Sequence, residues 1–171
     1  MAKTGFCNGS DMLLYVGDKA VGSCTTHTTT FNSETKERAV KPVASAPVAS
    51  GLWKKKGVVG LSYSISAEGL VFYDETECGF KELFKMWKAG QSVTVKCMER
   101  ENSDQPYLEG ACVISSLERT DPAQDDSTYT INLENDGEPS KLDEAAITEN
   151  GAAAASMSQT VPVDDQSDNE A

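Results

Sequence analysis

The sequence predicts a mainly β protein: a β-sandwich or partly open barrel of about seven strands with one packed α-helix. Two observations support this prediction. Apolar and polar residues alternate with period two in several short stretches, and a single stretch, from Phe80 to Trp87, has the three-and-four spacing of a helix. At 171 residues one domain is the default, and we expect it to span residues 1–139. A core of that size needs neither disulfides nor a metal for stability.

The first strands are expected near the start of the chain. Residues 12–16 form a short apolar run, and Gly17-Asp18 is a good turn. Residues 20–31 are rich in threonine, which is typical of a strand with one solvated face. We therefore expect residues 12–31 to form a β-hairpin.

The central strand begins near Val58 and alternates clearly from Leu61 to Ala67. Its apolar parity then changes, because Leu70 and Phe72 are even-numbered. A one-residue phase shift would turn every later side chain to the wrong face, so a bulge or tight turn is predicted at residues 68–69.

The predicted helix follows this strand. Thr76 is the expected N-cap and Gly90 the expected stop. Its apolar face is expected to pack into the core through Phe80, Leu83, Phe84 and Trp87. The remaining alternating stretches, residues 91–99, 107–117 and 129–133, are predicted strands, with Gly110 marking a bulge or a close approach.

Residues 32–56 have no apolar periodicity and are predicted to form a long arm loop. Structureless loops of more than about 12–15 residues are uncommon in compact domains and are often functional. Trp53 either folds back onto the core or anchors the arm to a partner. The candidate interface residues of this arm are Lys36, Arg38, Lys41, Pro42, Pro47, Trp53, Lys54, Lys55 and Lys56.

The charge is concentrated in the last third of the chain. Residues 1–119 hold 14 acids and 14 bases, whereas residues 120–171 hold 13 acids and one base. Residues 140–171 are small, polar and acidic without aromatics, so we expect a flexible tail. A nucleic-acid reader would show a basic stripe, which this chain lacks.

Catalytic chemistry finds little support in the sequence. His27 is the only histidine, and the five cysteines show no C-x-x-C pair, so no metal site, cofactor or Ser-His or Cys-His nucleophile is predicted. Phosphate loops and dinucleotide fingerprints are absent. We therefore predict that the protein is not an enzyme. No apolar run approaches the roughly 20 residues of a membrane span.

Several short blocks follow one another along the chain, and they are Asp11–Val16, Trp53, Gly60–Leu70, Gly90–Val95, Glu109–Ile114 and Ser127–Gly137. In their order and spacing these blocks resemble the major tail (tail tube) proteins of long-tailed, non-contractile bacteriophages, and the resemblance runs from about residue 11 to 138. The resemblance implies a structural virion protein that self-assembles into stacked hexameric rings. These rings form a tube that conducts the genome into the host cell.

The resemblance further implies that the arm at residues 32–56 reaches an adjacent ring. The implied partners are other copies of the chain, other tail proteins such as the tape measure and the tail terminator, and genomic DNA that passes the lumen without specific binding. The implied location is the tail of the virion, after synthesis in the host's bacterial cytoplasm. The acidic residues 140–171 depart from the family's pattern, and we expect them on the outer surface of the tube.

Two other functions stay open at this point. One is a different virion β-protein, such as a capsid decoration or tail-completion subunit, which would not polymerise. The other is a β-sandwich ligand-binding module, which would need exposed aromatics in a groove. Ring symmetry and the lumen-facing residues do not follow from the sequence.

Overall fold

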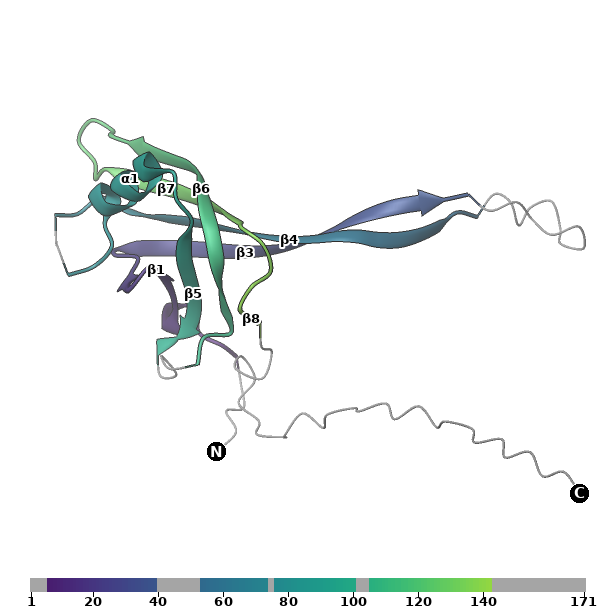
Figure 1. Ribbon diagram of the computed structural model, residues 1–171. Helices are drawn as coiled ribbons and strands as arrows, with labels where there is room; N and C mark the ends of the chain where they lie inside the picture. Colours follow the sequence, from purple (N-terminus) through teal and green to yellow (C-terminus); the bar gives the residue numbers. More distant parts are fainter. Residues whose placement is uncertain (1–5, 40–52, 74–75, 101–104, 143–171) are drawn as a thin grey trace, which may run out of the picture.

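The computed structural model describes residues 6–39, 53–73, 76–100 and 105–142. These residues form eight strands, one α-helix and one short 3-10 helix (Figure 1). In chain order the elements are η1 (Gly9–Asp11), β1 (Met12–Val16), β2 (Lys19–Ala20), β3 (Cys24–Arg38), β4 (Lys55–Leu70), α1 (Phe80–Ala89), β5 (Val93–Glu99), β6 (Leu108–Thr120), β7 (Thr128–Asn135) and β8 (Lys141–Leu142).

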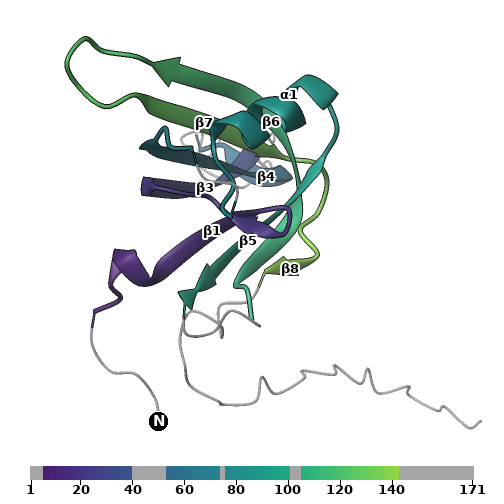
Figure 2. The same ribbon diagram turned by 90° about the vertical axis from the view of Figure 1, so that its left-hand side faces the viewer.

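All strands belong to one antiparallel sheet in the order β2-β1-β5-β6-β7-β4-β3, and β8 pairs with β6. The sheet curls so that β1 and β3 approach each other without pairing (Figure 2). The predicted class, a mainly β fold that is not closed and carries one helix, is confirmed. The core fills the inside of the curl, where Val16, Ile131 and Leu133 are completely buried. No helix in the described part of the chain could cross a membrane.

The predicted hairpin over residues 12–31 is wrong. The turn at Gly17 does return the chain, but only Lys19 and Ala20 pair with β1. A second turn at Gly22-Ser23, with Ser23 at φ 50°, then leads the chain away. β3 pairs along its whole length with β4. The long-range partner prevails because fourteen residue pairs form with β4, compared with two between β1 and β2.

The predicted bulge in the central strand is also wrong in its position. β4 pairs with β7 without a register shift from Ser64 to Leu70. The extra residue is Thr25 of β3, whose hydroxyl donates to the Glu68 carbonyl oxygen over 3.1 Å. The parity of β4 therefore does not change: Leu70 is exposed, and Val71 packs against the core instead.

The helix ends at Gly90, as predicted, because this glycine adopts the left-handed conformation (φ 64°). Its N-cap is Gly79 rather than Thr76. Leu83 is completely buried, and Phe80 and Met86 pack partly against the core. The prediction that Phe84 and Trp87 are core residues is wrong, since their exposed fractions are 45% and 47%. The sheet covers a face centred on Leu83 and Met86, which is rotated away from the aromatic stripe.

The later strands lie where the alternation placed them. Gly110 is a site of close approach, because a Cβ atom there would lie 2.2 Å from the Tyr63 hydroxyl oxygen. β8 pairs Leu142 with Leu108 and Lys141 with Glu109. The sheet therefore extends three residues past the expected domain end at residue 139. Residues 143–171, which make up most of the predicted tail at residues 140–171, lie outside the described residues.

Candidate assembly interface

The most distinctive feature of the structure is a two-stranded arm made of β3 and β4. β7 pairs with β4 only from Ser64 to Leu70, so residues 55–63 of β4 pair with β3 alone. Figure 1 shows the two strands running together far beyond the body. The predicted loop over residues 32–56 is thus partly wrong, because residues 32–38 and 55–56 continue the ladder. Because β3 and β4 stay paired through these residues, this part of the arm is a two-stranded sheet and not a loop.

The arm is anchored where it leaves the body. The Tyr63 backbone N–H donates to Oδ1 of Asn135, the last residue of β7, over 3.2 Å. This side chain replaces the backbone acceptor that the ladder loses at that point. The Tyr63 hydroxyl lies 3.6 Å from the buried Cys112 sulfur, and burial raises the pKa of Tyr63. Tyr63 also contacts the ring of its cross-strand partner Phe31, with 6.4 Å between the ring centroids.

One face of the arm carries apolar side chains into solvent. Leu61 continues the core-facing parity of Tyr63 and Ile65, yet its exposed fraction is 78%. A register shift between Glu34 and Thr35 inserts one extra residue into β4 and sets Val58 opposite Thr35. Because side chains alternate between faces, this bulge returns Val58 to the face of Leu61. The exposed large apolar residues of the arm are Phe31, Val58, Val59 and Leu61.

The outer part of the arm is basic. Residues 34–38 and 53–56 together hold five basic and two acidic side chains. The Glu37 carboxylate forms ion pairs with two of the lysines. Its oxygens lie 2.9 Å from Nζ of Lys54 and 3.5 Å from Nζ of Lys56. All three side chains are about half exposed, so these pairs contribute little to stability. They leave the end of the arm with excess positive charge on a chain whose formal net charge is −12.

The predicted interface residues divide into two groups. Lys36, Arg38, Lys54, Lys55 and Lys56 lie exposed on the arm, and Trp53 is 85% exposed, so it does not fold back onto the core. Lys41, Pro42 and Pro47 lie outside the described residues. None of the four apolar residues of the arm was predicted to lie on the surface. The apolar alternation of β4 continues from Tyr63 to Leu61, but alternation alone cannot show where the body ends and the projecting arm begins.

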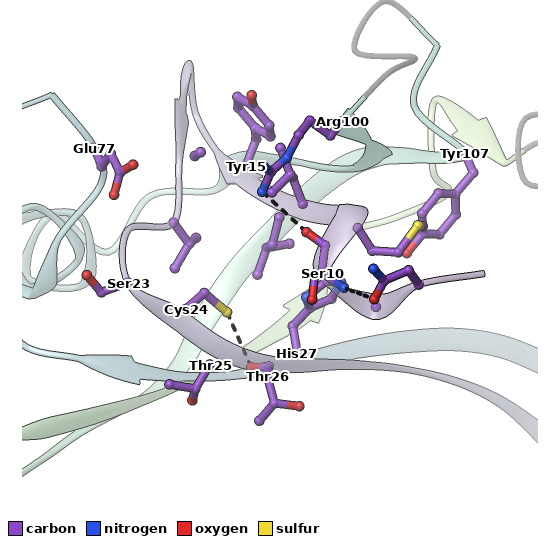
Figure 3. A pocket seen from close by; sticks show the side chains of 17 residues that line it. Ser10, Tyr15, Ser23, Cys24, Thr25, Thr26, His27, Glu77, Arg100 and Tyr107 are labelled. Atoms are coloured by element: carbon purple, nitrogen blue, oxygen red, sulfur yellow. Dashed lines mark hydrogen bonds between the residues drawn. The ribbon is translucent and has the colours of Figure 1, made fainter. Parts of the chain in front are cut away.

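A second feature is a groove of about 1000 Å³ between β1 and β3, where the two ends of the curled sheet approach each other (Figure 3). Arg100 donates to the Ser10 carbonyl oxygen over 3.3 Å at one side of it. Burial lowers the pKa of His27 and raises that of Cys24, so both groups are held neutral. Among the described residues no three His, Cys, Asp or Glu side chains form a cluster suited to a metal. The groove lies where the curled sheet does not close into a barrel.

Comparison with known proteins identifies a matching family and solved structures that share this fold. The family model described as phage tail tube protein matches residues 7–141. The tail of an empty gene transfer agent particle, refined with C6 symmetry, contains a chain with 18% identity and a TM-score of 0.63, covering 80% of this chain and 99% of that one. The SPP1 tail tube gives 15% identity and a TM-score of 0.52, covering 77% of both chains. No curated protein sequence matches this chain.

Proposed function

The chain belongs to the phage tail tube proteins, and on that premise we propose that it assembles with copies of itself into rings of six that stack into a tube. It is a structural protein of the virion. The ring of six is supported by the C6 symmetry of the gene transfer agent tail, whose subunit shares this fold. β3 is an end strand of the sheet, and its unpaired outer edge gives each subunit a strand with which a neighbour can pair.

The arm is the element that we assign to contacts between successive rings. The observation that carries this assignment is the exposed apolar face of Val58 and Leu61 on a hairpin that projects beyond the body. A monomer gains nothing from holding such side chains in water, whereas burial against a second subunit yields about 25 cal/mol per Å². We propose that the basic residues of the arm, including Lys36, Arg38, Lys54 and Lys55, meet acidic side chains of the next ring, since the chain holds 27 acids and 15 bases.

The tube is proposed to conduct the genome without binding it. Phosphate contacts from Lys and Arg supply most sequence-independent DNA affinity. Residues 1–119 carry equal numbers of acids and bases, which supports a wall without net positive charge. This role is passive, and we propose that the protein is not an enzyme.

The remaining partners follow from the position of a tube within a tail. We propose contacts with a tape measure inside the tube and with a terminator at its end. A chain of an extracellular contractile injection system, from a structure of its sheath/tube terminator, shares the fold with 15% identity and a TM-score of 0.53. We also propose that the protein is synthesised in the cytoplasm of a bacterial host.

The arm assignment is tested with the double variant Val58→Ser/Leu61→Ser. Both side chains are exposed in the single chain, so its melting temperature should stay within a few degrees of wild type. Electron microscopy of concentrated protein should show tubes for wild type and none for the variant. Val113→Ser, an exposed change on the body, is the matched control and should form tubes.

The two possible failures can be told apart. If the double variant forms normal tubes, the arm does not join the rings. If the wild-type chain stays monomeric even with the other tail proteins present, the assembly function itself is wrong.

A further inference from the structure

An aromatic stripe on α1 runs from Phe80, which packs partly against the core, to Phe84 and Trp87 on the solvent side. Phe80 and Phe84 stack with 6.2 Å between ring centroids, and Phe84 and Trp87 stack with 5.8 Å. The guanidinium carbon of Arg119 lies 5.4 Å from the Phe80 ring centroid. Phe84 and Trp87 remain nearly half exposed. The stripe is therefore an apolar surface whose aromatic faces are already arranged side by side.

A basic stripe runs beside the aromatic one. Lys81, Lys85 and Lys88 are exposed, and at 100° per residue they occupy the helix surface next to Phe84 and Trp87. None of the three forms an ion pair with another described residue. This combined surface, called here the α1 face, fits a partner that joins apolar side chains to carboxylates.

The chain itself contains such a segment. Residues 143–171 hold seven acids and no base. Residues 161–171 read VPVDDQSDNEA, so two valines stand directly before four acids. We infer that residues 161–171 bind the α1 face of their own chain, with the valines on the aromatic stripe and the carboxylates on the lysines. This inference concerns the free subunit and goes beyond tube assembly.

The connecting chain is long enough for this contact. β8 ends at Leu142, at the opposite end of the body from α1 (Figures 1 and 2). Residues 143–160 can span about 60 Å when extended, and a body of this size is roughly 35 Å across. A tether of this length gives an effective concentration in the millimolar range, so a weak contact suffices.

The lysines of the arm are the competing site for the acids, and the structure favours α1. Lys54 and Lys56 already share the carboxylate of Glu37, and the arm projects away from the body. An acidic segment that bound to Lys54 or Lys56 would have to displace Glu37. The lysines of α1 require no such exchange with a described residue.

The two tryptophans of the chain make a direct test possible. In the full chain with Trp53→Phe, Trp87 is the only tryptophan and reports on the α1 face. Acrylamide quenching of Trp87 in monomeric fractions is compared with that of the same chain carrying Asp164→Asn/Asp165→Asn. We expect about twofold stronger quenching in the neutralised chain, and the same increase in the parent when salt rises to about 0.5 M, because salt screens the ion pairs. Glu134→Gln/Glu138→Gln, which removes two acids from the body, is the matched control and should change nothing.

The opposite results overturn the inference. Equal quenching of Trp87 in the parent and the neutralised chain would show that the acids do not cover α1. Protection of Trp53 instead, measured in a Trp87→Phe chain, would place the segment on the arm. Protection that rises with protein concentration, or occurs only in assembled fractions, would show that a second copy covers this face.

Discussion

Tyr129 of β7 lies directly opposite Gly69 of β4, and its side chain occupies the space that a Cβ atom on Gly69 would fill. Such an atom would come within 2.6 Å of the tyrosine oxygen and 2.7 Å of the ring carbon that carries it. The Tyr129 hydroxyl donates to the Gly22 carbonyl oxygen over 2.8 Å, although the two residues are 107 positions apart. One glycine thus allows a buried tyrosine to tie β7 to the turn before β3.

Gly69→Ala should destabilise the subunit by about 1–3 kcal/mol, since the new methyl group overpacks a filled core. The free energy of unfolding in urea measures this. Gly57→Ala is the control, because nothing lies within 4 Å of a Cβ at that position. An unchanged midpoint for Gly69→Ala would show that Tyr129 can move aside at no cost.

Tyr129→Phe should cost about 1–3 kcal/mol, because it leaves the Gly22 carbonyl without its side-chain donor in a buried site. The same urea titration measures it. The ring itself is retained, so its packing stays as it is. Stability equal to wild type would mean that water replaces the lost donor.

The five thiols should react with a labelling reagent in order of exposure, the most exposed first. Cys7 is exposed, Cys24 is half-buried, and Cys78, Cys97 and Cys112 are buried. Burial raises the pKa of Cys78 and of Cys97 to about 11, so hardly any thiolate is present at pH 8. A thiol-reactive disulfide reagent should label Cys7 first, and all five cysteines only in denaturant. Rapid labelling of a buried thiol in the native chain would contradict this packing.

The same buried thiols predict a loss of stability in base. Their pKa in the unfolded chain is near 9, so below pH 9 both states hold the proton and the stability is fully present. As pH rises from about 9 to about 11, only the unfolded chain ionises, and the free energy of unfolding falls by up to about 1.4 kcal/mol per pKa unit and thiol. Cys97→Ala should reduce this slope, and an identical slope in both proteins would argue against the assignment.

His27 should titrate below its ordinary value of about 6.5, because burial disfavours the imidazolium. The chain has one histidine, so proton NMR reports its midpoint without assignment problems. The folded state prefers the neutral ring. Its contribution is therefore present above pH 6.5 and is lost as pH falls below that value. A midpoint at or above 6.5 would mean that the groove admits water freely to this side chain.

Local patterns in the sequence determined where most of the strands lie and where the helix stops. The alternation at Leu61–Ala67 and the left-handed Gly90 are examples, because both depend on backbone geometry within a few residues. The family resemblance rested on the order of these same segments. The family and the mainly β fold with one helix followed correctly from this information.

Tertiary structure decided which strands pair and which apolar side chains are covered. Thr25, not Gly69, became the bulge residue, since β4 had to stay in register with β7 on its other edge. Leu61 and Trp87 follow the same apolar patterns as buried neighbours, yet both are exposed. Leu61 lies on the part of β4 that projects beyond the body, and Trp87 lies beside the face of α1 that the sheet covers. A periodic pattern identifies an apolar face, but only the long-range packing of the chain shows whether its own residues or a partner cover that face.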